Sequence, residues 1–163
     1  MIKVLFVDDD ENLLASLRRQ VRRMRPEWDV QTAVSGAEAL TFEDKMAFDV
    51  VVTDMSMPGM SGIQLVHALN QRSTGPDCIM LTGTADLETA AEIINTTRVS
   101  RFFTKPCPIE RLVTGIEDAA QIRNEGVPVG SSDVNAGVKL HQLAGAKMHQ
   151  RGSREGPRSG AFS

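Results

Sequence analysis

The sequence contains few cysteines and no long hydrophobic run, and each of these absences excludes a class of protein. Cys78 and Cys107 are its only cysteines, the first in an apolar segment and the second between two prolines. We therefore expect two reduced thiols, and neither a disulfide framework nor a structural zinc site. No segment approaches the roughly twenty apolar residues of a membrane span, and residues 1–4 do not begin a signal peptide. These absences predict a cytoplasmic protein with no membrane partner.

The composition is typical of a soluble globular protein, but its charge is unevenly distributed. Of the 163 residues, 41% are hydrophobic and 24% are charged, which is ordinary for a globular protein. The length predicts one domain and a shorter additional segment. Residues 1–125 hold 13 Lys and Arg against 19 Asp and Glu, a net charge of −6, whereas residues 126–163 hold 5 against 2, a net charge of +3. Residues 126–163 also carry seven of the 13 glycines. We expect this Gly/Ser-rich basic tail to be disordered.

Five short apolar segments alternate with helical patterns over residues 1–125. The periodicity predicts strands at Lys3–Val7, Asp29–Ala33, Val50–Thr53, Cys78–Leu81 and Arg101–Thr104. It predicts helices at about 11–25, 36–46, 62–72, 86–97 and 108–124, the first capped by Asp10 and closed by Pro26. Strands that are each followed by a helix favour parallel pairing covered on both faces. The predicted fold is therefore α/β, a doubly wound five-stranded parallel sheet.

Polar side chains stand where four of these strands end. Asp8 and Asp9 follow the first strand, Asp54 the third, Thr82 the fourth and Lys105 the fifth. The carboxyl ends of parallel strands meet at one edge of the sheet, where ligands bind in this class of fold. Three carboxylates crowded together favour a divalent cation, and Mg²⁺ prefers such oxygen ligands. A lysine can neutralise a phosphoryl group, and a carboxylate can accept one.

Each of these residues has a simpler interpretation when taken alone. Asp8 to Asp10 could form a helix-capping turn, Asp54 could precede a surface turn, and Lys105 could be a loop lysine. Their placement at one sheet edge favours a common site. The arginines between residues 18 and 25 have no interleaved aromatics, and their helix turns its other face to the core. We interpret them as a solvated face rather than a nucleic-acid contact.

Around these positions the chain resembles the receiver domains of two-component response regulators, with their flavodoxin-like fold. The resemblance covers residues 1–125 and leaves 126–163 as a tail. The acidic pair of the family matches Asp8 and Asp9, and the loop Asp-x-x-Met-Pro-x-x-x-Gly is matched in full from Asp54 to Gly62. The family's switch threonine, switch aromatic and Lys-Pro pair match Thr82, Phe102 and Lys105-Pro106.

The resemblance implies a phosphorylation site and a metal site. A histidine kinase or phosphotransfer protein would phosphorylate Asp54 in the presence of Mg²⁺. The first helix, which carries the arginines between residues 18 and 25, would help to dock the kinase. The metal would be bound by Asp9, Asp54 and the backbone carbonyl of Ser56, with Asp8 acting mainly through a water molecule.

The resemblance also implies a switch. Thr82 and Lys105 would bind the phosphoryl oxygens, Phe102 would rotate inward, and the Lys105–Pro106 bond would be cis. The output would be a changed protein-binding face at 86–124, which includes the option of a phosphorylation-dependent homodimer. Such a domain signals and assists its own phosphorylation, but it is not a turnover enzyme. No effector domain is recognisable after residue 125, so the chain is either a stand-alone receiver or part of a longer protein.

Two alternatives remain at this stage. Asp8 and Asp10 also fit the Asp-x-Asp signature of haloacid-dehalogenase-like phosphatases, with Asp8 as the nucleophile. That interpretation lacks a later acidic pair at a strand end and leaves the loop from Asp54 to Gly62 unexplained. The second alternative is a binding module of the same fold whose site no longer switches.

Overall fold

The computed structural model describes residues 1–83 and 99–125. Five strands and four helices occur in these residues, in the alternating order expected from the sequence. The strands are β1 (Lys3–Val7), β2 (Asp29–Ala33), β3 (Val50–Asp54), β4 (Asp77–Thr82) and β5 (Arg101–Thr104). The helices are α1 (Glu11–Met24), α2 (Gly36–Lys45), α3 (Gly62–Asn70) and α5 (Ile109–Asn124). The helix predicted at 86–97 and the tail predicted at 126–163 lie outside the described residues.

All five strands run parallel in one sheet, in the order β2-β1-β3-β4-β5. The order reverses beside β1, which makes the carboxyl ends of β1 and β3 neighbours at the point where such sheets bind ligands. The register pairs Val7 with Thr53, so that Asp8, which follows β1, emerges beside Asp54, the last residue of β3. The doubly wound parallel architecture is confirmed.

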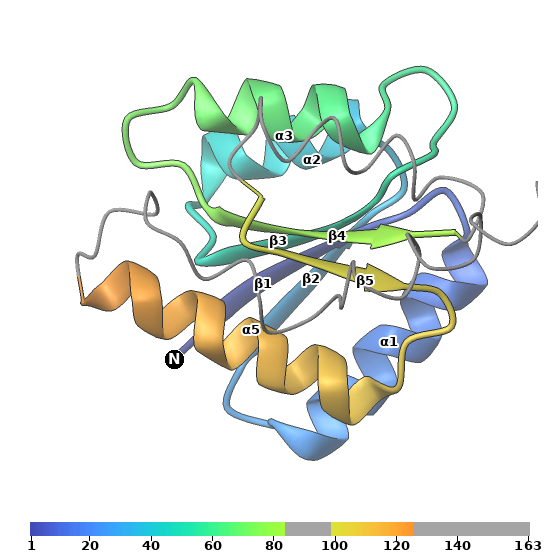
Figure 1. The fold of residues 1–163 in the computed structure, drawn as a ribbon, viewed down its shortest axis with the longest axis vertical. Coiled ribbons are helices and arrows are strands. Elements are labelled where there is room, and N and C mark those ends of the chain that lie inside the picture. Colours follow the sequence, from blue (N-terminus) through green and yellow to red (C-terminus); the bar gives the residue numbers. More distant parts are fainter. Residues whose placement is uncertain (84–98, 126–163) are drawn as a thin grey trace, which may run out of the picture. The chain divides into compact units, whose positions relative to one another are not determined.

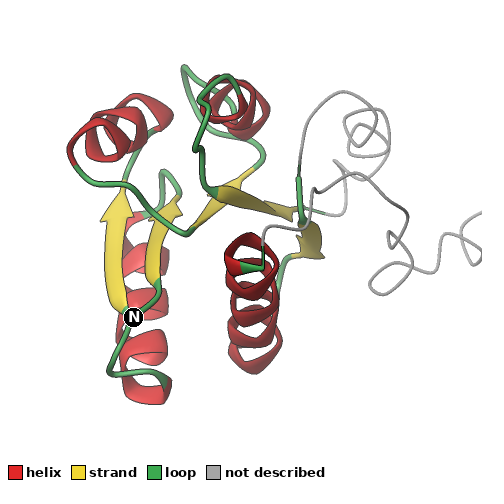
Figure 2. Cartoon of the chain, turned by 90° about the vertical axis from the view of Figure 1, so that its left-hand side faces the viewer, coloured by secondary structure: helices red, strands yellow, loops and turns green. Residues whose placement is uncertain are grey.

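Helices cover both faces of the sheet (Figures 1 and 2). α1 and α5 lie on one face and α2 and α3 on the other, as Figure 1 shows with the sheet between them. Two apolar clusters fill the spaces under these helices, and side chains alternate along each strand between the two. In β3, Val50 and Val52 enter one cluster and Val51 the other. A strand buried on both faces reads as an unbroken apolar run, which explains the segment before Asp54.

The first helix begins and ends where its flanking residues require. The carboxylate of Asp10 accepts hydrogen bonds from the backbone N–H groups of Asn12 and Leu13, so the predicted N-cap is confirmed. The helix ends at Met24 rather than at Arg25, because a residue before proline is driven out of the helical conformation. Arg25 accordingly adopts φ −137° and ψ 73°.

Other element boundaries differ from the expectations by one or two residues. β3 extends to Asp54 and β4 spans Asp77–Thr82, so the polar residues predicted to follow these strands are their last paired residues. The difference matters because a residue held in a sheet ladder has a fixed backbone. Asp54 and Thr82 thus present their side chains from rigid positions.

Candidate functional site at the carboxyl edge of the sheet

Three aspartates converge where β1 and β3 end. Each of Asp8, Asp9 and Asp54 offers a carboxylate oxygen, and these three oxygens lie within 4.8 Å of one another. Asp8 and Asp54 are buried, with exposures of 4% and 9%, whereas Asp9 is exposed. The predicted acidic cluster is therefore present. Its two buried members need compensation for their charge, because carboxylates this close repel one another when ionised.

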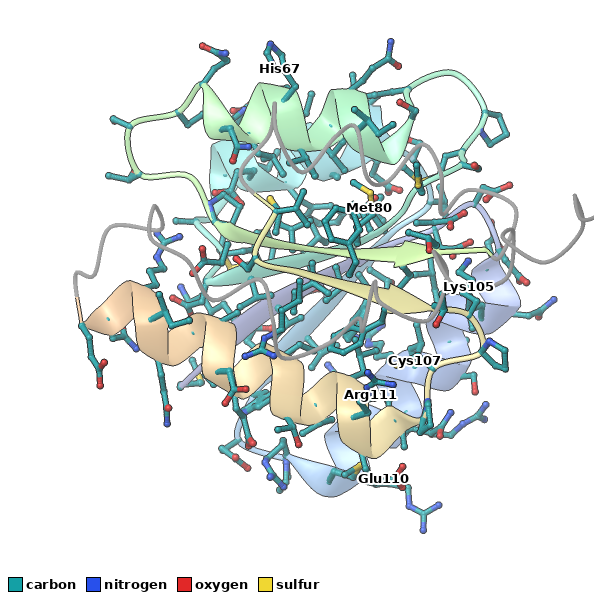
Figure 3. The ribbon with its side chains drawn as sticks, viewed as in Figure 1. His67, Met80, Lys105, Cys107, Glu110 and Arg111 are labelled. Carbon is teal, nitrogen blue, oxygen red and sulfur yellow. The ribbon has the colours of Figure 1, made fainter. Side chains whose placement is uncertain are left out.

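Lys105 supplies part of that compensation. Its ammonium lies 2.9 Å from Oδ2 of Asp8 and 3.1 Å from Oδ1 of Asp54. It follows β5, and Figure 3 shows it at the end of that strand, near the carboxyl edge of the sheet. The backbone N–H of Lys105 donates to the carbonyl of Thr82, and the Lys105–Pro106 bond is cis, as expected. One lysine thus connects the ends of β1, β3 and β5.

The surroundings of this ion pair shift the pKa values of both Asp54 and Lys105. Burial raises the pKa of Asp54, the hydrogen bond and charge of Lys105 act against it, and the net shift is upward. Burial also lowers the pKa of Lys105, but its hydrogen bonds to Asp8 and Asp54 outweigh that effect and raise the pKa above the ordinary value. The lysine is thus held as a cation at the centre of the acidic cluster.

Thr82 places a hydroxyl at the same edge. It ends β4 beside Asp54, since the register pairs Leu81 with Asp54 and Thr82 with Thr104. Thr82 is fully buried, and its Oγ1 has no hydrogen-bond partner among the described residues. A buried hydroxyl is usually satisfied. An oxygen-rich group bound at this edge would satisfy it.

The loop after Asp54 turns back tightly against its own strand. The N–H of Met55 donates to the carbonyl of Leu81, and the N–H of Gly62 donates to the carbonyl of Met55. A Cβ atom at Gly62 would lie 2.0 Å from the carbonyl oxygen of Asp54, so only glycine permits this approach. Gly59 adopts a φ of +77°, which explains the glycine of the Met-Pro-Gly turn. The close approach at Gly62 was not predicted from the sequence.

A capping box closes this loop at the start of α3. The hydroxyl of Ser61 accepts from the N–H of Gln64, whose side chain accepts in return from the N–H of Ser61. Sequence reasoning missed this cap, although Ser61-x-x-Gln64 is its ordinary signature. The cap fixes the far end of the loop that carries Ser56, and so it helps to hold the floor of the site.

Two further predicted site residues, Ser56 and Phe102, lie in different surroundings near the cluster. Ser56 is exposed, and it lines a groove of about 580 Å³ together with Asp9, Met55, Met57, Pro58 and others. Phe102 is half-buried and packs against the apolar cluster beneath α2 and α3, whereas Phe103 is buried on the opposite face. The structure thus brings Asp8, Asp9, Asp54 and Lys105 into one cluster. Phe102 lies outside this cluster, within β5.

The residues at this edge fit a magnesium ion. Two carboxylates are buried against one another, a third is exposed beside them, and the groove at Asp9 leads to solvent. Mg²⁺ takes one or a few carboxylates and keeps several water or phosphate ligands, which suits a cluster open on one side. The described residues contribute no sulfur or imidazole ligand to the cluster, and its carboxylate oxygens suit Mg²⁺ better than softer metals.

Comparison with known proteins agrees with this geometry. The family model described as "Response regulator receiver domain" matches residues 4–117. The chain belongs to this family. Receiver domains of response regulators are phosphorylated by histidine kinases, and they bind Mg²⁺ at an acidic pocket. The match spans all five strands and ends within α5.

Similar proteins include regulators and isolated receiver domains. The transcriptional regulatory protein PrrA of Mycobacterium bovis is 29% identical over 157 residues, which cover 92% of this chain and 63% of PrrA. A receiver domain protein of Clostridium thermocellum superposes with a TM-score of 0.70 at 26% identity, covering 77% of this chain and 98% of that one. A structure titled adenylate cyclase, from Rhodopirellula baltica, gives 0.69 at 35% identity, covering 76% and 90%. The chain thus spans less than two thirds of the length of PrrA.

The phosphatase alternative is not supported. The family match and the solved receiver structures favour the receiver assignment, and the structure adds a physical reason. In the phosphatase interpretation Asp10 would act on a substrate at the strand edge. Its Oδ1 instead accepts hydrogen bonds from two N–H groups in the first turn of α1.

Among the described residues, no helix is long and apolar enough to cross a membrane.

Proposed function

We propose that Asp54 is the phosphoryl acceptor of this receiver and that a histidine kinase or phosphotransfer protein is its donor. The observation that carries the proposal is the position of Asp54. Its carboxylate is buried beside Asp8 and Lys105, and the adjacent strand ends at Thr82, whose hydroxyl has no hydrogen-bond partner among the described residues. One nucleophile, one cation and one hydrogen-bond donor thus meet around the space a phosphoryl group would enter. Residues 1–125 form the receiver in this proposal, and 126–163 form a separate tail.

The transfer is a displacement at phosphorus. A carboxylate oxygen of Asp54 forms a bond to phosphorus while the bond from phosphorus to the donor's imidazole nitrogen breaks, and that nitrogen keeps the electron pair. The product is an acyl phosphate on Asp54. The attacking and leaving atoms lie roughly in line in such transfers, so catalysis rests on positioning and on neutralising charge. The sheet ladder at Asp54 provides the positioning.

Mg²⁺ would be held by Asp9, Asp54 and the backbone carbonyl of Ser56, with Asp8 acting mainly through a water molecule. When bound, it would neutralise charge on the phosphoryl oxygens. Asp8 already accepts a hydrogen bond from the N–H of Asp10 and the ion pair from Lys105. These contacts occupy both of its oxygens, which supports a role for Asp8 through water rather than by direct ligation.

Lys105 and Thr82 would bind the phosphoryl oxygens and so respond to phosphorylation of Asp54. A phosphoryl group on Asp54 draws the ammonium of Lys105 toward its oxygens and gives Oγ1 of Thr82 an acceptor. A movement of Thr82 toward that group would leave space on the side of β5, where Phe102 lies half-buried and can rotate inward. The output would be a shift between two arrangements of the face 86–124, of which residues 86–98 lie outside the described residues. That face would bind a protein, or a second copy of this chain, rather than nucleic acid.

Phosphorylation by a small-molecule donor tests the proposal. The wild-type protein, incubated with acetyl phosphate and Mg²⁺, should gain the mass of one phosphoryl group, and chelation of the metal should prevent the gain. The Asp54→Asn variant should gain nothing. The matched control is Asp44→Asn, since Asp44 is a largely exposed aspartate that forms an ion pair with Arg72 and is not part of the acidic cluster. It should be phosphorylated like the wild type.

Two results would overturn the proposal. Phosphorylation of Asp54→Asn at the wild-type level would place the acceptor elsewhere. Rapid repeated turnover of the donor without accumulation of phosphoprotein, persisting in Asp54→Asn but lost in Asp8→Asn, would indicate an enzyme instead of a switch. A domain that signals should hold the label long enough for its partner to respond.

A further inference from the structure

A groove of about 550 Å³ lies between α1 and the end of β2, away from the acidic cluster. α1 and β2 pack against each other, and the groove is lined on the sheet side by Thr32, within β2, and by Val34, which follows the strand. Its wall is basic and its floor is partly apolar. The lining residues that matter here are Glu11, Leu14, Arg18, Arg19, Arg22 and Val34.

The three arginines of this groove have no partner among the described residues. No ion pair or hydrogen bond joins Arg18, Arg19 or Arg22 to another described side chain or carbonyl. The described arginines outside α1 are each engaged: three pair with a carboxylate, Arg111 lies over the ring of Phe103, and Arg123 donates to two carbonyls. In a domain with an excess of acids, three neighbouring arginines without a partner in the described part of the chain are a distinct feature of this groove.

The spacing of these arginines brings like charges close together on the helix, where they repel one another. Arg18 and Arg22 are four residues apart on the helix and Arg19 and Arg22 are three apart, so like charges face one another within one turn. The negative end of the helix dipole favours Arg22 in the last turn but falls off before Arg18. In addition, Nε of Arg18 is buried without an acceptor in the described part of the chain. A bound anion would relieve the repulsion and would bring acceptors to this guanidinium group.

The apolar side of the groove indicates what else the anion carries. Val34 is 41% exposed, one of three large apolar side chains so exposed in residues 1–83 and 99–125. Leu14 forms the buried floor beside it. Glu11 lies seven residues before Arg18, about 10.5 Å along the helix axis, and it repels anions from that end of the groove. A ligand with its charge at the arginines and an apolar body on Val34 fits this arrangement.

We propose that the α1–β2 groove binds an organic phosphate, with the phosphate on Arg18, Arg19 and Arg22 and the organic body against Val34. Arginine suits this ligand because its planar fork donates two parallel hydrogen bonds to phosphate oxygens. The volume lies within the range of about 300–1,000 Å³ that small-molecule sites occupy. The proposal assigns a ligand site to a groove that shares no residue with the acidic cluster.

Calorimetric titration with ADP tests the site. The buffer should contain EDTA, so that no Mg–nucleotide complex can form at the acidic cluster, and about 150 mM salt to screen weak charge contacts. ADP should bind one site in the wild-type protein. Arg18→Gln and Arg22→Gln should each weaken binding by about tenfold, the effect of losing one charge-assisted hydrogen bond. The matched control is Arg23→Gln, since Arg23 is on the same helix but outside the groove lining, and it should change affinity less than about twofold.

The probes and variants also define the results that would overturn the proposal. Absence of ADP binding up to about 1 mM would leave the arginines as a solvated face. An equal loss in Arg23→Gln would indicate unspecific attraction to a basic helix. Inorganic pyrophosphate binding as tightly as ADP would show that the apolar floor contributes nothing. A glutamate-rich peptide or duplex DNA that displaces ADP with higher affinity would identify a macromolecular surface instead. The urea midpoint of each variant, expected at or above the wild-type value, shows that the variant is folded.

Discussion

The ammonium of Lys105 lies 3.1 Å from Oδ1 of Asp54, although the strands that deliver these residues are not neighbours. β4 lies between β3 and β5, so the ion pair spans the end of a whole strand. Thr82, at the end of that intervening strand, is fully buried, and its hydroxyl has no hydrogen-bond partner in residues 1–83 and 99–125. The arrangement ties the state of Asp54 to the position of β5, from which Phe102 projects.

Replacement of Lys105 by methionine should destabilise the metal-free protein and strengthen binding of Mg²⁺. Asp8 and Asp54 would remain buried without their cation. The expected cost is about 1–3 kcal/mol, less than for a fully buried pair because the lysine side chain is 32% exposed. Loss of one positive charge at the cluster should raise the affinity for Mg²⁺ by about tenfold. Urea unfolding in EDTA and calorimetry with MgCl₂ measure the two effects.

Lys45→Met provides the control for this prediction, since Lys45 lies in the last turn of α2. It should leave the affinity for Mg²⁺ unchanged. A Lys105→Met variant that binds Mg²⁺ no more tightly than the wild type would show that the lysine and the metal do not share the carboxylates.

Gly62→Ala should damage the fold and the site more than Gly59→Ala. A Cβ at position 62 would strike the carbonyl oxygen of Asp54, a backbone atom in the sheet, so α3 or the strand end must shift. The expected loss is about 3 kcal/mol, at the upper end of the cost of overpacking. Gly59 has open space around it, and its alanine variant bears only the cost of a positive φ, about 1–2 kcal/mol.

Urea unfolding gives both values, and phosphorylation by acetyl phosphate reports the site. Gly59→Ala should remain phosphorylated at close to the wild-type rate, whereas Gly62→Ala should be slower even where it is folded. Equal stability of the two variants would contradict the close approach at Gly62.

Glu43→Gln should remove part of the dependence of stability on pH. Glu43 is buried in α2 and accepts a hydrogen bond from the N–H of Phe48. Burial raises its pKa above the ordinary value of 4.5, while that hydrogen bond, Arg72 and Arg123 act against the shift and Asp44 adds to it. A carboxyl group with a raised pKa in the folded state contributes stability below its unfolded pKa and loses it as pH rises through the folded pKa.

The free energy of unfolding of Glu43→Gln, relative to the wild type, should therefore increase from pH 4 to pH 7. Comparing the two proteins across this range cancels any constant difference due to the amide. A relative stability that stays level, or falls as pH rises, would contradict the upward shift at Glu43.

Much of the fold follows from the pattern of the sequence. A strand buried on both faces appears as a short unbroken apolar run, and this is why β1 was predicted to the residue. The edge strands β2 and β5 were also predicted to the residue, although they are only partly buried and contain polar residues. Helix ends were less certain because they depend on local geometry. Arg25 leaves α1 under the influence of Pro26, an effect that composition alone does not place to one residue.

The membership of the site was predictable, but its contacts were not. Strand ends in a parallel sheet share an edge, so Asp8, Asp54 and Lys105 could be assigned to one place from their positions alone. Contact between Lys105 and two carboxylates depends on side-chain geometry, which the sequence does not specify. Two further features arise from tertiary packing: the approach of Gly62 to the carbonyl of Asp54 and the burial of Glu43. The hydrophobic periodicity of the sequence does not predict either of them.

The most direct measurement locates the phosphoryl group in the chain. Wild-type protein treated with acetyl phosphate and Mg²⁺ is reduced with borohydride, which converts an aspartyl phosphate to homoserine, and the peptides are sequenced by mass spectrometry. We predict homoserine at Asp54 alone, and none when EDTA replaces the metal. Homoserine at Asp8 or Asp9, or its absence from Asp54 in a protein that carries phosphate, would contradict the assignment of Asp54 as the acceptor.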